Sequence, residues 1–292
     1  MELDLPIYYK NLFIIYIMIS KNLIGCLCQI SKYVYEPSSF FKSNYNVMPY
    51  KKEMTWLYEL SKEPKLVESD IDCQCYLSVF NKKNILCAFR GTENARDWLT
   101  DANIIRVRMD LEGVEDNKRP LVHWGMLRQF RSVEDKITKY IDEQTKENSE
   151  IDTIIYTGHS LGGALATIAT VNYGHKYKNL NHKCVSFGAP RCGNTSFKNY
   201  FNNVCDFSKR YVNYFDPIPS TPFSLRYTHV CKQDHIENDH LVIRDTEVVR
   251  FFWVLYYKFL NWFGWEYDPI DDHKIDLYYE HLNRIFEDES LI

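Results

Sequence analysis

The sequence lacks an excess of positive charge. Its 292 residues include 35 Lys and Arg against 39 Asp and Glu, which gives a formal net charge of -4. No stripe of basic residues with interleaved aromatics occurs, so the composition argues against a nucleic-acid partner. Internal repeats, low-complexity segments and linker-like stretches are also missing. With 45% hydrophobic and 25% charged residues, the chain is typical of a globular protein, and we expect residues 1–292 to form a single domain.

The N-terminus lacks the features of a signal peptide or a membrane span. The strongly apolar run at residues 12–19 is shorter than the roughly 20 residues that cross a bilayer. Glu2 and Asp4 precede it where a signal peptide carries positive charge, and no small-residue cleavage site follows. We expect a buried helix within an N-terminal helical segment at residues 1–60. We expect a cytoplasmic protein that could also contact a membrane peripherally. Secretion or N-terminal anchoring is the alternative.

Metal-binding spacings are scarce as well. The chain has 9 cysteines, but Cys26-x-Cys28 and Cys73-x-Cys75 do not have the spacing of zinc ribbons. Several cysteines fall in predicted strands, so we expect buried free thiols and a reducing compartment. His235 and His240 could suggest a metal pair, although a polar loop is the preferred interpretation. We therefore expect no metal and no cofactor.

What the chain does contain is an alternation of strand-like and helix-like segments. Residues 75–80 and 85–90, joined by a polar turn, are typical of a β-hairpin. Apolar residues recur every three or four positions across residues 125–146 and predict an amphipathic helix. Further strands are predicted at residues 151–157, 184–187 and 210–215, and further helices at residues 164–171 and after His273. This order predicts an α/β fold with a mainly parallel central sheet flanked by helices.

The motif Gly158-His159-Ser160-Leu161-Gly162 lies between a β-branched run and a helix-like run. It matches G-x-S-x-G, and strand, sharp turn and helix are the setting of a nucleophile elbow. The glycines permit a backbone that a Cβ would obstruct, so the Ser160 hydroxyl can stand clear of the turn. Ser160 is the candidate nucleophile, and an ordinary strand–helix turn is the alternative.

A serine nucleophile needs a base, usually His, and a carboxylate that orients the base. With an elbow of this kind the acid and then the base follow the serine along the chain. Asp216 is the best acid because it ends a predicted strand and two prolines shape the loop after it; a simple Asp-Pro strand end is the alternative. His273 is the best base because it lies where a loop enters the last helix. His229 is expected to make a structural hydrogen bond and His281 to be a surface or packing residue.

The oxyanion of an acyl-transfer intermediate needs hydrogen-bond donors. The backbone N–H of Leu161 is one candidate. The loop after an earlier strand, Phe89-Arg90-Gly91-Thr92, supplies the other, because Thr92 offers both an N–H and a hydroxyl. An ordinary turn Thr is the alternative for this position.

These segments together resemble the class 3 (fungal-type) lipase family of the α/β-hydrolase superfamily over roughly residues 70–280. The motifs, in the family's order, are Phe89-Arg90-Gly91-Thr92, Asp97-Trp98-Leu99-Thr100-Asp101, Val122-His123-Trp124-Gly125, Thr157 to Gly163, Phe187-Gly188-Ala189-Pro190-Arg191, Asp216-Pro217-Ile218-Pro219, Tyr227-x-His229-Val230 and His273-x-x-x-x-Tyr278. The resemblance implies an α/β-hydrolase fold, no cofactor and ester hydrolysis through an acyl-enzyme. It assigns the nucleophile to Ser160, the acid to Asp216, the base to His273 and the oxyanion hole to Thr92 and Leu161.

The resemblance also implies a short lid helix directly after Thr92. In this chain the lid would hold Arg96, Trp98 and Leu99, which could cover the site in water and turn to a lipid surface on opening. A fixed surface helix is the alternative. Residues 246–266 form a strongly aromatic insertion that is expected to be helical and either packed in the core or docked in a membrane interface.

The sequence thus predicts a serine acyl hydrolase, a lipase that cleaves carboxylic esters of acylglycerols or related lipids. An esterase for small soluble esters on the same scaffold is the first alternative. A catalytically silent lipid-binding protein is the second. A lipid ester is the expected substrate and a membrane or lipid-droplet surface an expected contact, whereas the oligomeric state is not indicated.

Overall fold

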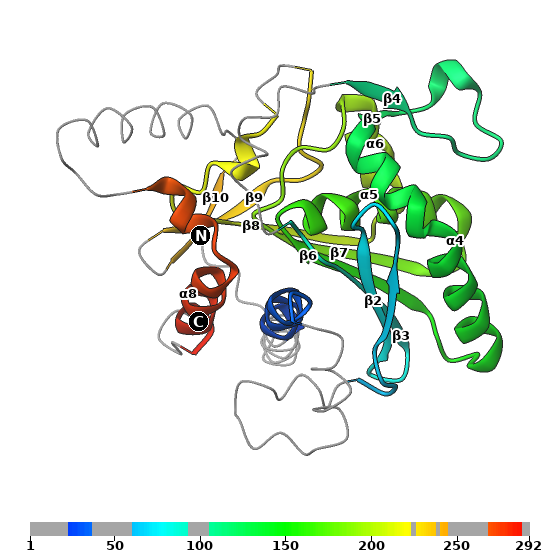
Figure 1. The fold of residues 1–292 in the computed structure, drawn as a ribbon, viewed down its shortest axis with the longest axis horizontal. Coiled ribbons are helices and arrows are strands. Elements are labelled where there is room, and N and C mark those ends of the chain that lie inside the picture. The colour runs from blue at the N-terminus through cyan, green and yellow to red at the C-terminus, as the bar shows by residue number, and fades with distance from the viewer. Residues whose placement is uncertain are drawn as a thin grey trace, which may run out of the picture.

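An eight-stranded sheet in the order β1-β2-β3-β6-β7-β8-β9-β10 forms the centre of the fold (Figure 1). The computed structural model describes residues 23–36, 60–92, 105–222, 226–237, 240–244 and 268–287. The strands are β1 (Lys65–Glu68), β2 (Gln74–Phe80), β3 (Asn84–Phe89), β6 (Thr153–His159), β7 (Asn181–Phe187), β8 (Phe207–Asn213), β9 (Gln233–Glu237) and β10 (His240–Arg244). Strands β3, β6, β7, β8 and β9 run parallel, and the outer strands are antiparallel to their neighbours. The predicted mainly parallel sheet is confirmed.

Helices cover both faces of this sheet (Figure 1). One face packs against α4 (Trp124–Glu147), α5 (Leu161–Lys176) and α6 (Thr195–Val204). The other packs against the helix at residues 23–33 and against α8 (Ile275–Glu287). This arrangement explains why the inner strands are apolar without a break, since side chains on both faces of a covered strand are buried.

The side chains of β3 alternate between two hydrophobic clusters, one on each face of the sheet. Ile85, Cys87 and Phe89 belong to the hydrophobic cluster beneath α4 and α5. Leu86 and Ala88 belong to the cluster on the opposite face, with the helix at residues 23–33. Successive side chains of one strand therefore hold two helical layers to the same sheet, and the carboxyl ends of the parallel strands share one edge.

Helix α5 is buried on all sides. Every residue from Leu161 to Gly174 is buried, because the helix lies between the sheet and both α4 and α6. Helix α4 is amphipathic as predicted, with Met126, Phe130 and Ile137 on its buried face. The rigid α5 fixes the position of the turn that precedes it.

Two elements differ from the sequence-based expectations. His235 and His240 lie on the paired strands β9 and β10 and not in a polar loop, and His235 is buried. The second sheet, formed by β4 (Arg106–Arg108) and β5 (Leu121–His123), was not predicted. Three-residue strands are too short to show a period-2 pattern in the sequence.

Several expectations fall on residues outside the described ranges. These are the lid at residues 93–99, with Arg96, Trp98 and Leu99, the aromatic insertion at residues 246–266, and most of the N-terminal segment at residues 1–60. Within that segment residues 23–33 are helical. Among the helices that the structure describes, none combines the length and the apolar character needed to cross a bilayer.

Candidate active site

Ser160 occupies a sharp turn between β6 and α5. Its backbone has φ 57° and ψ -130°, a conformation that costs an L-residue energy and that clusters at functional sites. The flanking glycines are required here, because a Cβ on Gly158 would overlap the backbone of Gly162 and a Cβ on Gly162 would overlap the carbonyl oxygen of Phe89. The G-x-S-x-G pattern therefore corresponds to a turn in which β6, α5 and the end of β3 approach to backbone contact.

Asp216 lies in the loop after β8 and His273 at the end of a short 3-10 helix, η4 (Pro269–His273). The His273 Nδ1 atom is 2.8 Å from Asp216 Oδ2. Asp216 is completely buried, and its carboxylate also accepts hydrogen bonds from the Tyr278 hydroxyl at 2.6 Å and from the Ile218 N–H at 2.9 Å. A buried carboxylate is costly unless it is fully paired, and these donors provide the pairing.

The second ring nitrogen of His273, Nε2, is buried and has no hydrogen-bond partner among the described residues. Because Nδ1 donates to Asp216, Nε2 carries the lone pair of the neutral ring. The structure gives no Ser160 Oγ–His273 Nε2 hydrogen bond within its described part, and such bonds often tighten only when substrate is bound. The His273 ring lies 4.5 Å from the ring of His159, the residue before Ser160, so His273 packs against the turn that holds Ser160.

The candidate oxyanion donors lie beside the same turn. The loop after β3 passes the elbow so closely that a Cβ on Gly91 would lie 3.2 Å from Ser160 Cβ. Thr92 follows in this loop, and Leu161 begins α5. The structure thus brings together Ser160, Leu161, Asp216, His273 and the loop of Thr92.

Gly188, at the end of β7, is a site residue whose role the sequence did not reveal. Its φ is +59°, in the left-handed region. A Cβ at this position would lie 2.9 Å from Asp216 Oδ2, 3.0 Å from the Tyr278 hydroxyl and 3.1 Å from His273 Cε1. Glycine is therefore required both by the backbone conformation and by the Asp216–His273 pair packed against it.

We expect Gly188→Ala to lower kcat at least about tenfold, because the added methyl group displaces the Asp216–His273 pair and the left-handed backbone costs an L-residue about 1 kcal/mol. The measurement is steady-state hydrolysis of a soluble ester. Gly25→Ala is the matched control, because nothing lies within 4 Å of its Cβ position. Equal losses in both variants would contradict the steric role of Gly188.

His159 is buried beside this pair with both ring nitrogens engaged. Its Nε2 lies 2.6 Å from the main-chain oxygen of His273, and its Nδ1 lies 3.0 Å from the hydroxyl of Tyr35. Burial lowers the pKa of His159 well below its ordinary value, and the nearby His273 lowers it further. His159 is therefore neutral in the folded protein.

We expect acid to destabilise the fold through buried histidines. Burial lowers the pKa of both His159 and His182 below the ordinary 6.5. Below that pH the unfolded chain binds protons that the folded state excludes, so the free energy of unfolding falls as the pH falls. The slope is up to about 1.4 kcal/mol per pH unit for each group. Urea denaturation between about pH 7.5 and 5.5 measures this slope, and His182→Asn should reduce it; a flat profile would contradict the prediction.

Cysteine is a poor competitor for the role of nucleophile. All nine cysteines fall in the described residues, and they form no disulfide there. Burial raises the pKa of Cys73 and of Cys184 to about 12, which removes the thiolate that reacts.

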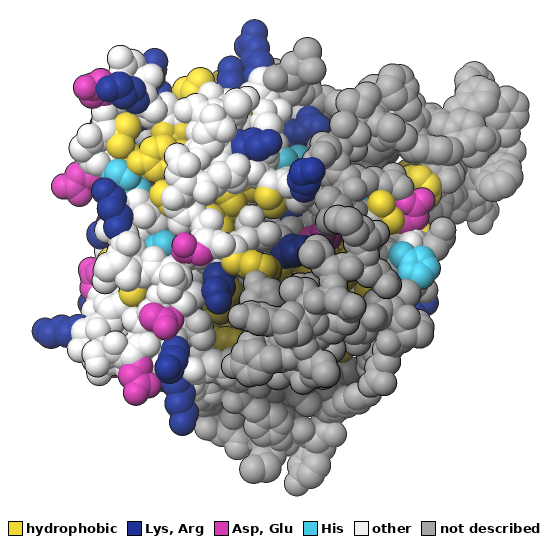
Figure 2. All heavy atoms as spheres, turned by 180° about the vertical axis from the view of Figure 1, so that it is seen from behind, with side chains coloured by type: hydrophobic (Ala, Val, Ile, Leu, Met, Phe, Trp, Pro, Cys, Tyr) yellow, Lys and Arg dark blue, Asp and Glu magenta, His cyan; other side chains and the backbone are white. Residues whose placement is uncertain are grey.

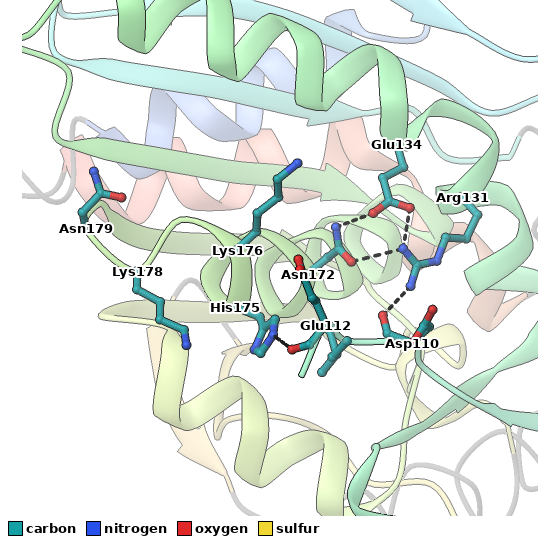
Figure 3. A pocket seen from close by; sticks show the side chains of 10 residues that line it. Asp110, Glu112, Arg131, Glu134, Asn172, His175, Lys176, Lys178 and Asn179 are labelled. Carbon is teal, nitrogen blue, oxygen red and sulfur yellow. Dashed lines mark hydrogen bonds and ion pairs between the residues drawn. The ribbon is translucent and has the colours of Figure 1, made fainter. Parts of the chain in front are cut away.

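A polar depression of about 770 Å³ lies at the other end of α5 (Figure 3). Its lining groups bind one another: Arg131 forms an ion pair with Glu134, Asn172 donates to Glu134 at 2.7 Å, and His175 lies 2.7 Å from the carbonyl of Glu112. His175 is roughly 22 Å from Ser160 at 1.5 Å per helical residue. The depression therefore belongs to a different part of the molecule from the Asp216–His273 pair.

Figure 2 shows the face of the molecule opposite to that of Figure 1. On its described part, Lys and Arg side chains are interspersed with Asp and Glu, and hydrophobic side chains form small groups among them.

The sheet order, the strained serine between β6 and α5, and the Asp–His pair at the carboxyl edge define an α/β-hydrolase fold. Residues 86–225 match the family described as Lipase (class 3). The resemblance inferred from the motifs is confirmed. Asp216 lies inside the matched residues, whereas His273 and Tyr35 lie outside them.

Individual relatives agree with this assignment. The secreted mono- and diacylglycerol lipase A of Penicillium cyclopium is 29% identical over 167 residues, covering 54% of this chain and 50% of that protein. The lipase of Rhizopus oryzae is 32% identical over 144 residues, covering 48% and 35% respectively. The chain thus spans about half the length, or less, of these curated relatives.

Solved structures show the same fold. Lipase II from Rhizopus niveus has a TM-score of 0.64 and 24% identity, covering 78% of this chain and 85% of that one. The triacylglyceride lipase of Rhizomucor miehei has a TM-score of 0.61 and 20% identity, covering 76% and 82%. The α/β-hydrolase fold expected from the sequence is therefore confirmed.

Proposed function

We propose that this protein is a serine acyl hydrolase, a lipase that cleaves carboxylic ester bonds of acylglycerols or related lipids. The observation that carries the proposal is the buried Asp216–His273 pair, in which His273 also contacts His159, the residue before the strained Ser160. Two comparisons support it. The Penicillium cyclopium relative is a mono- and diacylglycerol lipase, and one similar structure is described as a triacylglycerol lipase whose catalytic centre is a serine protease triad.

In the proposed reaction His273 Nε2 accepts the proton of Ser160 as the serine oxygen attacks the ester carbonyl. Asp216 stays ionised, fixes the tautomer of His273 and stabilises the imidazolium. Its bonds from Tyr278 and Ile218 hold the carboxylate in place. The Leu161 N–H and Thr92 stabilise the oxyanion. His273 then protonates the leaving alcohol and later activates the water that hydrolyses the acyl-enzyme.

A pair of exposed apolar side chains supports a lipid aggregate as the substrate. Ile105 is 58% exposed and Trp124 is 40% exposed, and the Trp124 N–H donates to the Ile105 carbonyl at 2.9 Å. The guanidinium of Arg128 lies 5.5 Å from the centre of the Trp124 ring. Trp with a neighbouring cation is suited to the interface between water and lipid.

We expect activity on one partly soluble ester, such as tributyrin, to rise sharply once it exceeds its solubility limit. Ile105→Ser/Trp124→Ser should reduce that rise several-fold without changing the rate on dissolved substrate, because only apolar contact with the aggregate is lost. Val242→Ser is the matched control, since Val242 is also 40% exposed but lies on β10. A rate that does not change at the solubility limit would instead favour an esterase for soluble substrates.

A further inference from the structure

We propose that Tyr35 and His159 are positioning residues that hold the main chain of His273 in register with Ser160. The proposal rests on the proposed function, because it concerns the same site. Tyr35 follows the helix at residues 23–33 and lies outside residues 86–225, the part that matches the family. The proposal therefore makes this N-terminal segment part of the catalytic machinery.

The protons of the two hydrogen bonds can be assigned. A carbonyl oxygen only accepts, so the 2.6 Å contact between His159 Nε2 and the His273 oxygen requires a proton on Nε2. In a neutral ring Nδ1 is then the acceptor, so the Tyr35 hydroxyl donates to it across 3.0 Å. Burial and the nearby His273 both keep His159 neutral by lowering its pKa. The chain of donors therefore runs in one direction, from Tyr35 through His159 to His273.

The main chain at the base is anchored at two consecutive carbonyls. The carbonyl of Asp272 accepts from the Asn213 side chain at 3.0 Å, and Asn213 ends β8 just before the acid. The carbonyl of His273 accepts from His159, which ends β6 just before the nucleophile. The base is thus tied to the acid strand by one bond and to the nucleophile strand by the other. The second bond joins the base directly to the residue before Ser160.

Tyr35 also touches the loop that carries Thr92. A Cβ on Gly91 would overlap the Tyr35 hydroxyl, so this oxygen lies directly against the backbone of the loop. The Arg90 guanidinium lies 5.8 Å from the centre of the Tyr35 ring. One side chain therefore contacts both the loop of the oxyanion donor and, through His159, the base. Loss of its hydroxyl should loosen the alignment that the acylation step needs, because small displacements of reacting groups cost large factors in rate.

The test is Tyr35→Phe, which removes one hydroxyl and keeps the ring. We expect the rate of labelling by a fluorophosphonate and the kcat for p-nitrophenyl butyrate to fall about tenfold, with KM little changed. The downfield NMR resonance of the His273–Asp216 proton should broaden. Tyr156→Phe is the matched control, because its hydroxyl also lies 3.0 Å from a histidine Nδ1, that of His182, away from the triad. Tyr156→Phe should lose as much stability as Tyr35→Phe but should keep the rates of the unmodified protein.

Two replacements of His159 extend the test. His159→Gln places an amide donor near the His273 carbonyl and should retain more activity than His159→Leu, which has no donor. Wild-type rates in Tyr35→Phe, or equal rate losses in Tyr35→Phe and Tyr156→Phe, overturn the positioning role and leave the proposed function intact. Absence of labelling in the unmodified protein overturns the proposed function itself, and the positioning role with it.

Discussion

Ser160→Ala should lower ester hydrolysis by roughly 10⁵- to 10⁶-fold while the protein stays folded. The hydroxyl is the only group lost, and the alanine keeps the Cβ and the backbone of the elbow. The remaining activity would come from the oxyanion donors and from substrate binding. The measurement is kcat on p-nitrophenyl butyrate, with the thermal unfolding curve as the check on folding.

Ser220→Ala is the matched control for this variant. Ser220 is also buried, ends the short 3-10 helix η3 (Ile218–Ser220) after Asp216, and its hydroxyl has no partner among the described residues. Removing an unpaired buried hydroxyl should leave both stability and kcat within about twofold of the unmodified protein. Substantial activity in Ser160→Ala would show that another residue is the nucleophile.

Asp216→Asn should lower kcat about 10⁴-fold with little change in KM. The carboxylate accepts hydrogen bonds from His273, Tyr278 and the Ile218 N–H, whereas an amide replaces one accepting oxygen by a donor. If the amide turns its NH₂ group to His273, the ring is held in the wrong tautomer and Nε2 no longer accepts the serine proton. If it turns the other way, the NH₂ group faces the Ile218 N–H, so two donors meet and the hydrogen bond from Ile218 is lost.

Asp206→Asn separates this effect from a general loss of charge. Asp206 precedes β8, and its carboxylate accepts from the His182 N–H at 2.7 Å, at the opposite end of the sheet from the elbow. Its replacement should leave kcat unchanged. If Asp216→Asn retained more than about a tenth of the unmodified rate, the buried carboxylate would be structural and not part of the catalytic group.

The strands and helices nearest the site followed from local patterns. The β2–β3 hairpin, α4, and the β6–turn–α5 unit each have a periodicity or a glycine signature within one short window. The β4–β5 pair could not be found this way, because its strands are only three residues long. His235 was misplaced in a loop because its polar neighbours, Asp234 and Glu237, conceal a strand paired on both sides.

The candidate site also contains some residues that local patterns predict and others that they do not. Ser160, Asp216 and His273 could be proposed because each follows or precedes a recognisable element, and the structure brings them together. The hydrogen bond between Tyr35 and His159 joins residues 124 positions apart, and no local pattern encodes it. In the sequence Gly188 appeared only as part of a motif. Its role depends on the side chains that pack against it, Asp216 from the loop after β8 and Tyr278 from α8, and these lie far from it along the chain.

The most direct test of Ser160 as the nucleophile is to treat the unmodified protein with a fluorophosphonate and to locate the adduct by mass spectrometry. We expect one adduct per chain, on the peptide that contains Ser160. An adduct on any other residue, or none at a concentration that labels other serine hydrolases, would contradict it.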